Sequence, residues 1–342
     1  MTRSITIAGG GLAGLALGIG LRRNGIPVRL HEAGHYPRHR VCGEFISGRG
    51  RPALERLGTE KRLLELGAVE AHTAAFHTEY CAGVIHELPE PALCISRHVL
   101  DLELAKTFSA LGGDLCVGSR WRGESCDEGL VCATGRRRHA TTVGQPWIGV
   151  KMHGQNIPLR AGLELHFSSM GYVGLCHVGG GVVNVCGLLR GDPLDSPKSV
   201  RAALCGNPGS ILHQRLAHAQ WDEASFCSMA GISLDPLRAA NHPLPCVGDS
   251  ITMIPPLTGN GMSMAFESAE LAIPHLMEWS RGALSWAQAQ SRIATACDAA
   301  FSRRLAVAGF LQRSFSFRSQ GLLLKIMDFI PWAWRLAFEN TR

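Results

Sequence analysis

The sequence lacks the paired cysteines of structural metal sites and the close groupings of catalytic side chains. Its 12 cysteines are scattered singly between Cys42 and Cys297, and no two of them form a C-x-x-C pair. We therefore expect no metal ion, and free thiols that pack as small apolar side chains in a reducing compartment. No Ser/His/Asp or paired-carboxylate arrangement stands out, so these patterns identify no catalytic side chain.

A large excess of charge of one sign is also missing. The 34 lysines and arginines against 28 aspartates and glutamates give a net charge of +6, spread along the chain apart from clusters at residues 38–40 and 136–138. No basic–aromatic alternation or known motif accompanies this excess, so we expect no nucleic-acid partner. The charge is compatible with an anionic substrate, an acidic carrier partner or a membrane surface.

Long hydrophobic runs are absent as well. The apolar run near the N-terminus is broken by glycines and followed by Arg22 and Arg23, which disfavours both a secretory signal peptide and a membrane span. The apolar and aromatic run at 321–336 is too short to span a bilayer, so it either packs on the fold, which we favour, or rests at a membrane interface. We expect a cytoplasmic protein, with peripheral membrane contact through this C-terminal helix as the alternative.

The most informative stretch of the sequence is residues 5–32, where a β-type run, a glycine turn, a helix-forming run and a second β-type run follow one another. Gly9, Gly11 and Gly14 occupy the G-x-G-x-x-G positions of a dinucleotide-binding turn. Gly9 permits the tight turn, Gly11 lets the backbone approach a pyrophosphate, and Gly14 lets the helix pack closely on the strand. Leu12 and Ala13 are the first residues of the helix. Its unpaired N–H groups would hold the phosphates.

An acidic residue and a basic loop follow this unit. Glu32 can accept hydrogen bonds from ribose hydroxyls and disfavours a 2′-phosphate, which points to FAD or NAD rather than NADP. The next loop is rich in glycine and arginine, and Arg40 is our first choice for a guanidinium that reaches the pyrophosphate. Gly43 would let the backbone pass close to a flat ring. The alternative is an ordinary solvated loop.

A second segment, far along the chain, also suggests a flavin nucleotide. A predicted strand ends in Gly248-Asp249, and a carboxylate there can accept from the polyol hydroxyls that FAD carries in its ribityl chain. A proline turn then leads into a helix whose positive N-terminus would stabilise negative charge on a reduced flavin. The turn residues that we expect at the cofactor are Pro256, Gly259, Asn260, Gly261 and Met262.

Together, G-x-G-x-x-G with Glu32, R-x-C-G-E from Arg40 to Glu44, and the later Gly-Asp and Pro-x-x-Gly-x-Gly elements resemble the p-hydroxybenzoate hydroxylase-like FAD-dependent oxidoreductase superfamily. The closest resemblance is to its geranylgeranyl reductase branch. It implies an α/β fold in which a Rossmann-type FAD-binding domain with a parallel sheet is interleaved with an antiparallel β-sheet substrate domain and followed by C-terminal helices. FAD is the implied cofactor, with NAD(P)H as a transient electron donor.

The resemblance also assigns roles to individual residues. It places Cys42, Gly43 and Glu44 beside the isoalloxazine ring, which makes Cys42 and Glu44 the candidates for catalysis; Cys42 is equally well explained as a packing residue. It places Arg97, at the start of a helix, next to FAD. The alternative for Arg97 is a surface salt bridge with Asp101, four residues further along that helix.

The predicted domain organisation alternates between the two halves of the fold. We expect the FAD-binding domain in residues 1–68, 96–146 and 233–280, a substrate-domain hairpin in 69–95, an antiparallel-sheet substrate domain in 147–232 and C-terminal helices in 281–342. Alternating apolar and polar residues predict an antiparallel meander over 147–189. Side chains that could line a substrate site there, although each is more often a core or surface residue, are Trp147, His153, His166, Tyr172 and His177.

From these features we predict an FAD-dependent oxidoreductase that acts on a hydrophobic isoprenoid or polyketide-type small molecule through flavin hydride or flavin C4a chemistry. One alternative is an aromatic hydroxylase that uses NAD(P)H and O2, although Thr134-Gly135 stands where those hydroxylases carry Asp-Gly, and no second glycine fingerprint is present. Halogenation is less favoured, because the Trp-x-Trp-x-Ile-Pro element of flavin halogenases is absent. Another alternative is a non-catalytic FAD-containing partner protein.

Overall fold

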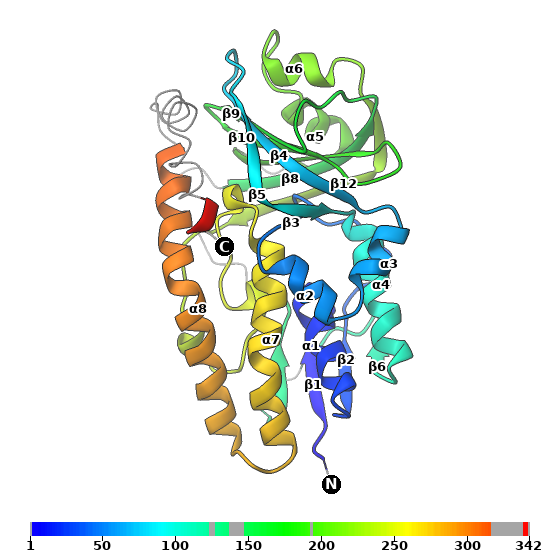
Figure 1. The fold of residues 1–342 in the computed structure, drawn as a ribbon, viewed down its shortest axis with the longest axis vertical. Coiled ribbons are helices and arrows are strands. Elements are labelled where there is room, and N and C mark those ends of the chain that lie inside the picture. The colour runs from blue at the N-terminus through cyan, green and yellow to red at the C-terminus, as the bar shows by residue number, and fades with distance from the viewer. Residues whose placement is uncertain (1, 123–126, 137–146, 192–193, 316–337, 341–342) are drawn as a thin grey trace.

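The computed structural model describes residues 2–122, 127–136, 147–191, 194–315 and 338–340. Two β-sheets form two stacked halves of an elongated molecule, with sheet B above sheet A in Figure 1. Residues 45–94 enter sheet B between strands of sheet A, so the chain passes between the two sheets several times. The apolar run at 321–336, and with it the predicted membrane contact, lies outside the described residues. No helix in the described part of the chain combines the length and the apolar character that crossing a bilayer requires.

Sheet A is the parallel sheet that the first glycine turn predicted. Its strands lie in the order β6-β2-β1-β7, with every pair parallel. The strands are β1 (Ile5–Ala8), β2 (Val28–His31), β6 (Asp114–Cys116) and β7 (Leu130–Cys132). In a parallel sheet all carboxyl ends lie at one edge, and β1, flanked by β2 and β7, marks the point where the strand order reverses.

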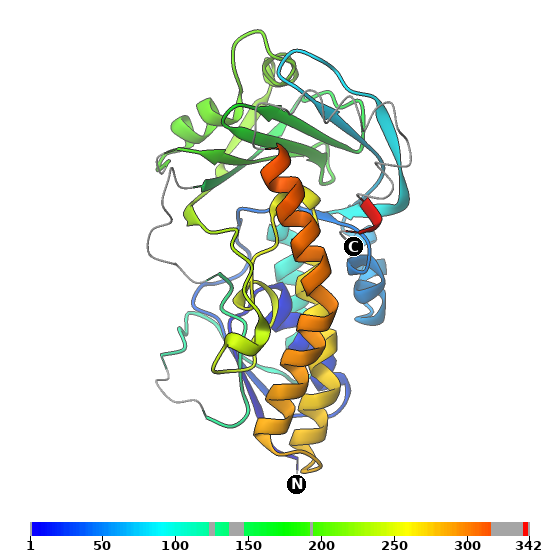
Figure 2. The same cartoon turned by 90° about the vertical axis from the view of Figure 1, so that its left-hand side faces the viewer.

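Four helices pack together on the half that contains sheet A. Helix α1 (Leu12–Arg23) contacts α4 (Arg97–Ala110) and α7 (Gly261–Ser280), and α8 (Trp286–Phe315) runs alongside α7 (Figure 2). Gly18 of α1 faces the ring of Phe108, and Gly20 faces Ile273 of α7, so small residues let α1 approach both neighbours closely. The remaining helices of this half are α2 (Gly50–Arg56), α3 (Glu60–Glu65) and the short 3-10 turns η1 (Ala239–Asn241), η2 (Gly248–Ser250) and η3 (Pro256–Thr258).

Sheet B has the order β12-β8-β11-β10-β9-β4-β5-β3. Its strands are β3 (Phe45–Ile46), β4 (Val69–His77), β5 (Ile85–Cys94), β8 (Trp147–Gln155), β9 (Leu163–Ser168), β10 (Gly171–His177), β11 (Val183–Arg190) and β12 (Gln220–Ile232). The hairpin over 69–95 and the meander over 147–189 are confirmed. The expectation of a purely antiparallel sheet is wrong, because β4 and β9 pair in parallel. These two strands are joined by a long excursion through the other half, which removes the constraint that a tight hairpin would impose.

The two faces of sheet B have different partners. One face packs under α5 (Pro197–Leu204) and α6 (Ile211–Leu216), with Val150, Leu175 and Val185 in its core. The opposite face, which we call the inner face, carries Phe167, Tyr172 and Leu188. These side chains share an apolar cluster with Met253, Leu257 and Leu311 from the half that contains sheet A. The inner face therefore looks toward the carboxyl edge of sheet A.

Candidate functional site

The first glycine turn has the packing that its motif predicts. Gly9 has a φ of +114°, which favours glycine, and a side chain on it would collide with the carbonyl oxygen of Ala133 after β7. A side chain on Gly14 would collide with the carbonyl oxygen of Gly9. A side chain on Gly11, in contrast, would meet nothing within 4 Å. Gly9 and Gly14 thus serve the close packing of strand and helix, and only Gly11 faces open space at the helix N-terminus.

The second segment lies directly beside this turn. A single parallel bridge joins Cys132 of β7 to Cys246, so the chain leaves sheet A at its carboxyl edge just before Gly248 and Asp249. A methyl group on Gly248 would stand 2.8 Å from Cβ of Ala13 in the first turn of α1. The predicted strand before Gly248 is reduced to this one bridge. Two elements that were inferred separately from the sequence therefore meet at one edge.

Asp249 directly follows Gly248 at the carboxyl edge of sheet A. Its side chain is exposed to solvent, yet protein surrounds it on most sides. This burial raises the pKa of Asp249 to about 6, and the charges of Arg97 and Arg136 offset the effect only in part. A carboxylate in this setting gains from hydroxyl donors, because it has lost part of its hydration.

Glu32 is already hydrogen-bonded by the protein. Its Oε2 accepts from the Gly10 amide at 2.9 Å, and its Oε1 accepts from the Gly34 amide at 2.7 Å and pairs with Arg38 at 2.7 Å. Burial opposes its ionisation, but the bonds from Arg38 and Gly34 outweigh burial and lower the pKa of Glu32. A carboxylate offers about four acceptor positions. One position on Oε2 is therefore left for a hydroxyl group.

Two arginines flank the buried carboxylate of Asp101. Arg97 binds it with two parallel hydrogen bonds, Nε at 2.6 Å and Nη2 at 2.8 Å. Arg40 lies more loosely between two acids, 3.5 Å from Asp101 and 3.8 Å from Glu32. The salt bridge that the sequence offered as the alternative for Arg97 is present, but the prediction of a surface location is wrong, because both Arg97 and Asp101 are buried. Arg40, about one-third exposed (35%), keeps donors available toward this edge.

The loop after Arg40 is attached to sheet B through its carbonyl groups. The carbonyl oxygen of Cys42 accepts from Asn184 Nδ2 at 3.0 Å, and that of Gly43 accepts from the Cys176 thiol at 3.3 Å. A trans peptide group points its C=O and N–H in opposite directions, so the N–H of Gly43 faces away from the sheet. A side chain on Gly43 would meet nothing within 4 Å, which leaves that side of the loop open. Burial raises the pKa of the Cys42 thiol, so this thiol is protonated at neutral pH.

Glu44 is the anchor of this loop. It is completely buried and has a φ of +54°, a left-handed conformation that is uncommon outside glycine. Its Oε2 accepts from His153 Nε2 at 2.7 Å, and its Oε1 accepts from the Arg97 amide at 2.8 Å and lies 3.5 Å from the ammonium of the fully buried Lys151. Burial disfavours the charge, yet His153 and Lys151 outweigh burial and lower the pKa of Glu44. Sequence patterns suggested Glu44 and His153 separately, but they did not suggest Lys151.

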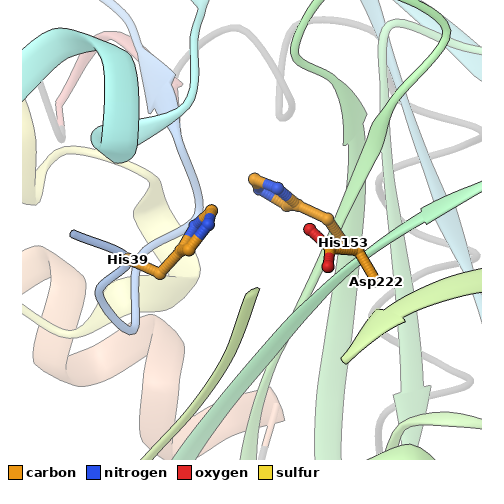
Figure 3. A group of neighbouring side chains, drawn as sticks. All are labelled: His39, His153 and Asp222. Atoms are coloured by element: carbon orange, nitrogen blue, oxygen red, sulfur yellow. The ribbon is translucent and has the colours of Figure 1, made fainter. Parts of the chain in front are cut away.

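His39 extends this network toward solvent. Lys151 donates to Nδ1 of His39 at 3.0 Å, and the ring of His39 stacks on His98 with centroids 4.5 Å apart. Burial and the nearby charge of Lys151 lower the pKa of His39 to about 4, so the ring is neutral at pH 7. Figure 3 shows the rings of His39 and His153 approaching each other from the loop and from β8, with the exposed Asp222 of β12 beside His153. These residues connect the buried ion pair with the surface.

Two groups of side chains have the composition of a metal site. Ligand atoms of His39, His153 and Asp222 lie within 4.8 Å of one another. The ammonium of Lys151 on His39 disfavours a cation there. The second group consists of His77, Glu164 and His166, which are all buried in the face of sheet B that packs under α6. Arg215 of α6 already neutralises the Glu164 carboxylate, with its Nε 3.0 Å from Oε2. The expected absence of a metal ion stays a prediction.

One stretch of the sequence does have the spacing of a metal-binding motif. Residues 31–35 have the H-E-x-x-H spacing of zinc-dependent hydrolases, a motif that works when both histidines share one face of a helix. Here His31 ends β2 and His35 lies in the following loop. The acid between them, Glu32, is committed to backbone amides and Arg38. The run therefore lies at the carboxyl edge of sheet A and not on a helix.

The turn before α7 reaches the same region. Gly259 has a φ of +65°, and Gly261 begins α7 without a side-chain cap on its N-terminal amides. Asn260 and Met262 are buried, and Ser263 donates to the carbonyl oxygen of Ser47 at 2.5 Å. The N-terminus of α7 thus lies against the segment that follows Glu44. Pro256 opens the short η3 turn that precedes it.

The remaining predicted lining residues fall in different places. His153 joins the Glu44 network, and Tyr172 and Trp147 belong to the inner face, where Arg190 lies 4.8 Å above the Trp147 ring. His166 is on the opposite face. His177 lines a separate cavity of about 250 Å³ together with residues of β4 and of the 159–162 loop.

The fold can be compared with that of solved structures. The flavin-dependent brominase Bmp2 superimposes with a TM-score of 0.78 and 14% identity, covering 98% of this chain and 92% of its own. A geranylgeranyl bacteriochlorophyll reductase-like protein from Thermoplasma acidophilum gives 0.74 and 16%, covering 96% and 90%. PqsL, a probable FAD-dependent monooxygenase from Pseudomonas aeruginosa, gives 0.70 and 16%, covering 94% and 99%. This chain has the fold of the p-hydroxybenzoate hydroxylase-like FAD-dependent enzymes.

The resemblance and the fold class inferred from the sequence are therefore confirmed at the level of the fold. No protein-family model and no curated protein matches the chain in sequence. The brominase superimposes at least as well as the reductase-like protein. The assignment to the geranylgeranyl reductase branch stays a prediction.

Proposed function

We propose that this chain binds FAD and is an oxidoreductase acting on a hydrophobic isoprenoid or polyketide-type small molecule. The observation that carries the proposal is the contact of Gly248 with Ala13, which brings the Gly-Asp element to the G-x-G-x-x-G turn. A dinucleotide has a phosphate centre with a sugar-like chain on either side. Two glycine turns at one sheet edge, each followed by an acid, suit such a molecule.

The residues at this edge fit the parts of FAD in order. The open side of Gly11 and the N-terminus of α1 would receive the pyrophosphate. The free acceptor position on Glu32 would take a ribose hydroxyl, and Arg40 would add a guanidinium. Asp249, whose carboxyl group is partly desolvated, would accept from the ribityl hydroxyls. None of these positions requires a protein side chain to move out of a packed core.

The flat ring would lie between the loop 42–44 and the N-terminus of α7. Gly43 offers an outward N–H and an open side, and the positive end of α7 favours negative charge nearby. When bound, FAD supplies hydride transfer or oxygen activation, which is the chemistry that this chain's own side chains lack. Glu44 would act as a positioning residue, because its bonds to His153 and Lys151 hold the loop on sheet B. His39 and Asp222 would carry protons between this buried network and solvent.

The inner face of sheet B supports an apolar substrate. Its cluster contains aromatic and aliphatic side chains from β9, β10 and β11 together with Met253, Leu257 and Leu311. Burying such surface gives roughly 25 cal/mol per Å², so an isoprenoid or polyketide skeleton would gain its affinity there. NAD(P)H would then act only as a transient donor.

Two further functions remain alternatives: an aromatic hydroxylase using NAD(P)H and O2, and a non-catalytic FAD-containing partner protein. One experiment separates them. The FAD-loaded protein is reduced anaerobically with dithionite and mixed with a prenyl substrate, or with oxygen and a phenolic substrate. Reoxidation by the prenyl compound without oxygen supports the reductase; oxygen-dependent product formation supports the hydroxylase or, with added halide, a halogenase. Reoxidation that no organic substrate accelerates would overturn the enzymatic proposal.

A further inference from the structure

A cavity of about 250 Å³ lies where two strands of sheet B separate. Strands β4 and β9 pair in parallel from Ala74 and Leu163 onward. Just before this point, the Gly162 amide donates to the Thr73 hydroxyl oxygen at 3.0 Å. The residues that line the cavity all belong to β4, the end of β5, the end of β10 and the loop 159–162. The cavity is therefore distinct from the edge of sheet A where the two glycine turns meet.

Two polar residues of the lining, Thr73 and His177, lie on the face of sheet B that is opposite to the inner face. Side chains alternate between the two faces along a strand. Thr73 precedes Ala74, and His177 follows Cys176, and both of these neighbours belong to the apolar cluster of the inner face. Leu159, also in the lining, packs in the cluster under α5 and α6. The polar side of the cavity thus looks away from the proposed flavin site.

The cavity has apolar walls and room for a small molecule. Its aliphatic lining residues are Val69, Ala71, Leu159 and Ala161. An apolar cavity of about 150 Å³ accommodates benzene, and sites for drug-sized ligands measure about 300–1,000 Å³. A volume of about 250 Å³ therefore suits a ligand with a short hydrocarbon part.

Arg160 brings a positive charge to this cavity that the protein does not neutralise. Arg160 lines the cavity, and its guanidinium forms no hydrogen bond or ion pair with the residues that the structure describes. Its backbone amide donates to Glu164 Oε1 at 2.5 Å, but the carboxylate of Glu164 pairs with Arg215. A guanidinium stays protonated at all physiological pH values. The cavity therefore has a fixed cation at its wall.

The other polar groups of the lining favour an anion as well. Glu70 contributes a carboxylate, but Arg51 of α2 forms an ion pair with it, and His72 Nε2 lies 3.7 Å from it. The Thr73 hydroxyl accepts from Gly162, which leaves its own O–H to donate. The His177 ring can donate too, and within the described ranges it has no hydrogen-bond partner.

We propose that this cavity binds a short-chain carboxylic acid in its ionised form. The carboxylate pairs with the Arg160 guanidinium, whose planar fork matches the two oxygens, and it accepts a further bond from Thr73 or His177. The hydrocarbon chain lies against the aliphatic walls. An ammonium ligand would meet the like charge of Arg160, and a sugar would place hydroxyl groups against apolar side chains. The site requires no flavin, so the inference goes beyond the proposed function.

Fluorine NMR titration tests this site with 4,4,4-trifluorobutanoate as the probe and 4,4,4-trifluorobutanamide as its neutral counterpart. Arg160 is exposed, so water screens the ion pair, and we expect the carboxylate to bind wild-type protein about five-fold more tightly than the amide. Butanoate should displace the probe, whereas acetate at the same concentration should not, because it lacks the apolar chain. Displacement by acetate as strong as that by butanoate would overturn the proposal.

Two arginine variants locate the binding. Arg160→Gln should abolish the preference for the carboxylate. Arg201→Gln on α5 removes the same charge from an arginine outside the cavity and should keep the preference. No binding of the carboxylate to wild-type protein, a preference that survives in Arg160→Gln, or its loss in Arg201→Gln as well would overturn the assignment. The titrations are run with and without FAD, and flavin absorbance reports FAD binding separately, so failure of the proposed function is distinguished.

Discussion

Gly248 lies against Ala13, with room for no side chain between them: a methyl group on Gly248 would stand 2.8 Å from the Ala13 Cβ. The two residues belong to two glycine-bearing segments that lie far apart in the sequence. Their contact sets Asp249 beside the N-terminus of α1. Gly248 also has a φ of +62°, so both its backbone conformation and this contact favour glycine.

The two glycines of the first turn should separate binding from folding. Gly14→Ala places a methyl group against the Gly9 carbonyl and should destabilise the protein by about 1–3 kcal/mol. Gly11→Ala enters open space at a helix N-cap and should cost about 1 kcal/mol or less, yet it should weaken FAD binding at least tenfold. Urea unfolding and FAD titration of both variants measure the two effects. Equal FAD affinity for Gly11→Ala and wild-type protein would contradict the account.

Asp249 should make stability depend on pH in an unusual direction. Its pKa is raised to about 6 in the folded protein, above the ordinary value of 3.8. The folded state therefore holds the proton more tightly, and ionisation costs stability as pH rises from about 4 through 6. Asp249→Asn should be more stable than wild-type protein at pH 8, and the difference should vanish near pH 4, while FAD affinity falls. Denaturant unfolding at both pH values checks the sign, and a difference that grows on acidification would refute it.

His39 should contribute the opposite dependence. Its pKa is lowered to about 4 from the ordinary value of 6.5. The unfolded chain binds this proton more readily, so the contribution is complete above pH 6.5 and is lost as pH falls toward 4. Burial is the main cause of the lowered pKa of His39; the nearby charges of Lys151, His153 and His98 lower it further, and Glu44 opposes them. His39→Asn should flatten the fall in unfolding free energy between pH 6.5 and 5, and slopes identical to wild type would show that the ring titrates normally.

The buried ion pair of Glu44 and Lys151 should show strong coupling. Glu44→Gln leaves the ammonium of Lys151 buried without its counter-ion and should cost about 3 kcal/mol or more. Lys151→Met alone should also destabilise, whereas the double variant should recover much of the loss. Chemical denaturation of the four proteins gives the interaction energy. Additive effects of the two single changes would mean that the pair does not hold the loop on sheet B.

Local sequence signals identified the parts of the fold that depend on neighbouring residues. The glycine turn and the alternation over 147–189 each follow from a few adjacent side chains. The parallel pairing of β4 with β9 could not be predicted, because it depends on a contact across the chain that no local period encodes.

The candidate site divides in the same way. Glu32, Arg40, Asp249 and the glycines were found through motif positions. Lys151 and His39 were not, since a lysine in an alternating strand is expected on the solvent side. The ion pair with Glu44 and the bond to His39 make its burial acceptable. For Arg97, the spacing of four residues predicted its partner Asp101, but it did not predict that the ion pair is buried.

The most direct test of the account is equilibrium titration of the purified, folded protein with FAD, followed by flavin fluorescence and by absorbance after gel filtration, with Gly11→Ala and Asp249→Ala as paired variants. We expect wild-type protein to retain one FAD per chain and to stay yellow, and both variants to lose most of the flavin while keeping their fold. A colourless wild-type protein after incubation with excess FAD, or full retention by both variants, would contradict the claim that the two glycine turns bind one flavin nucleotide.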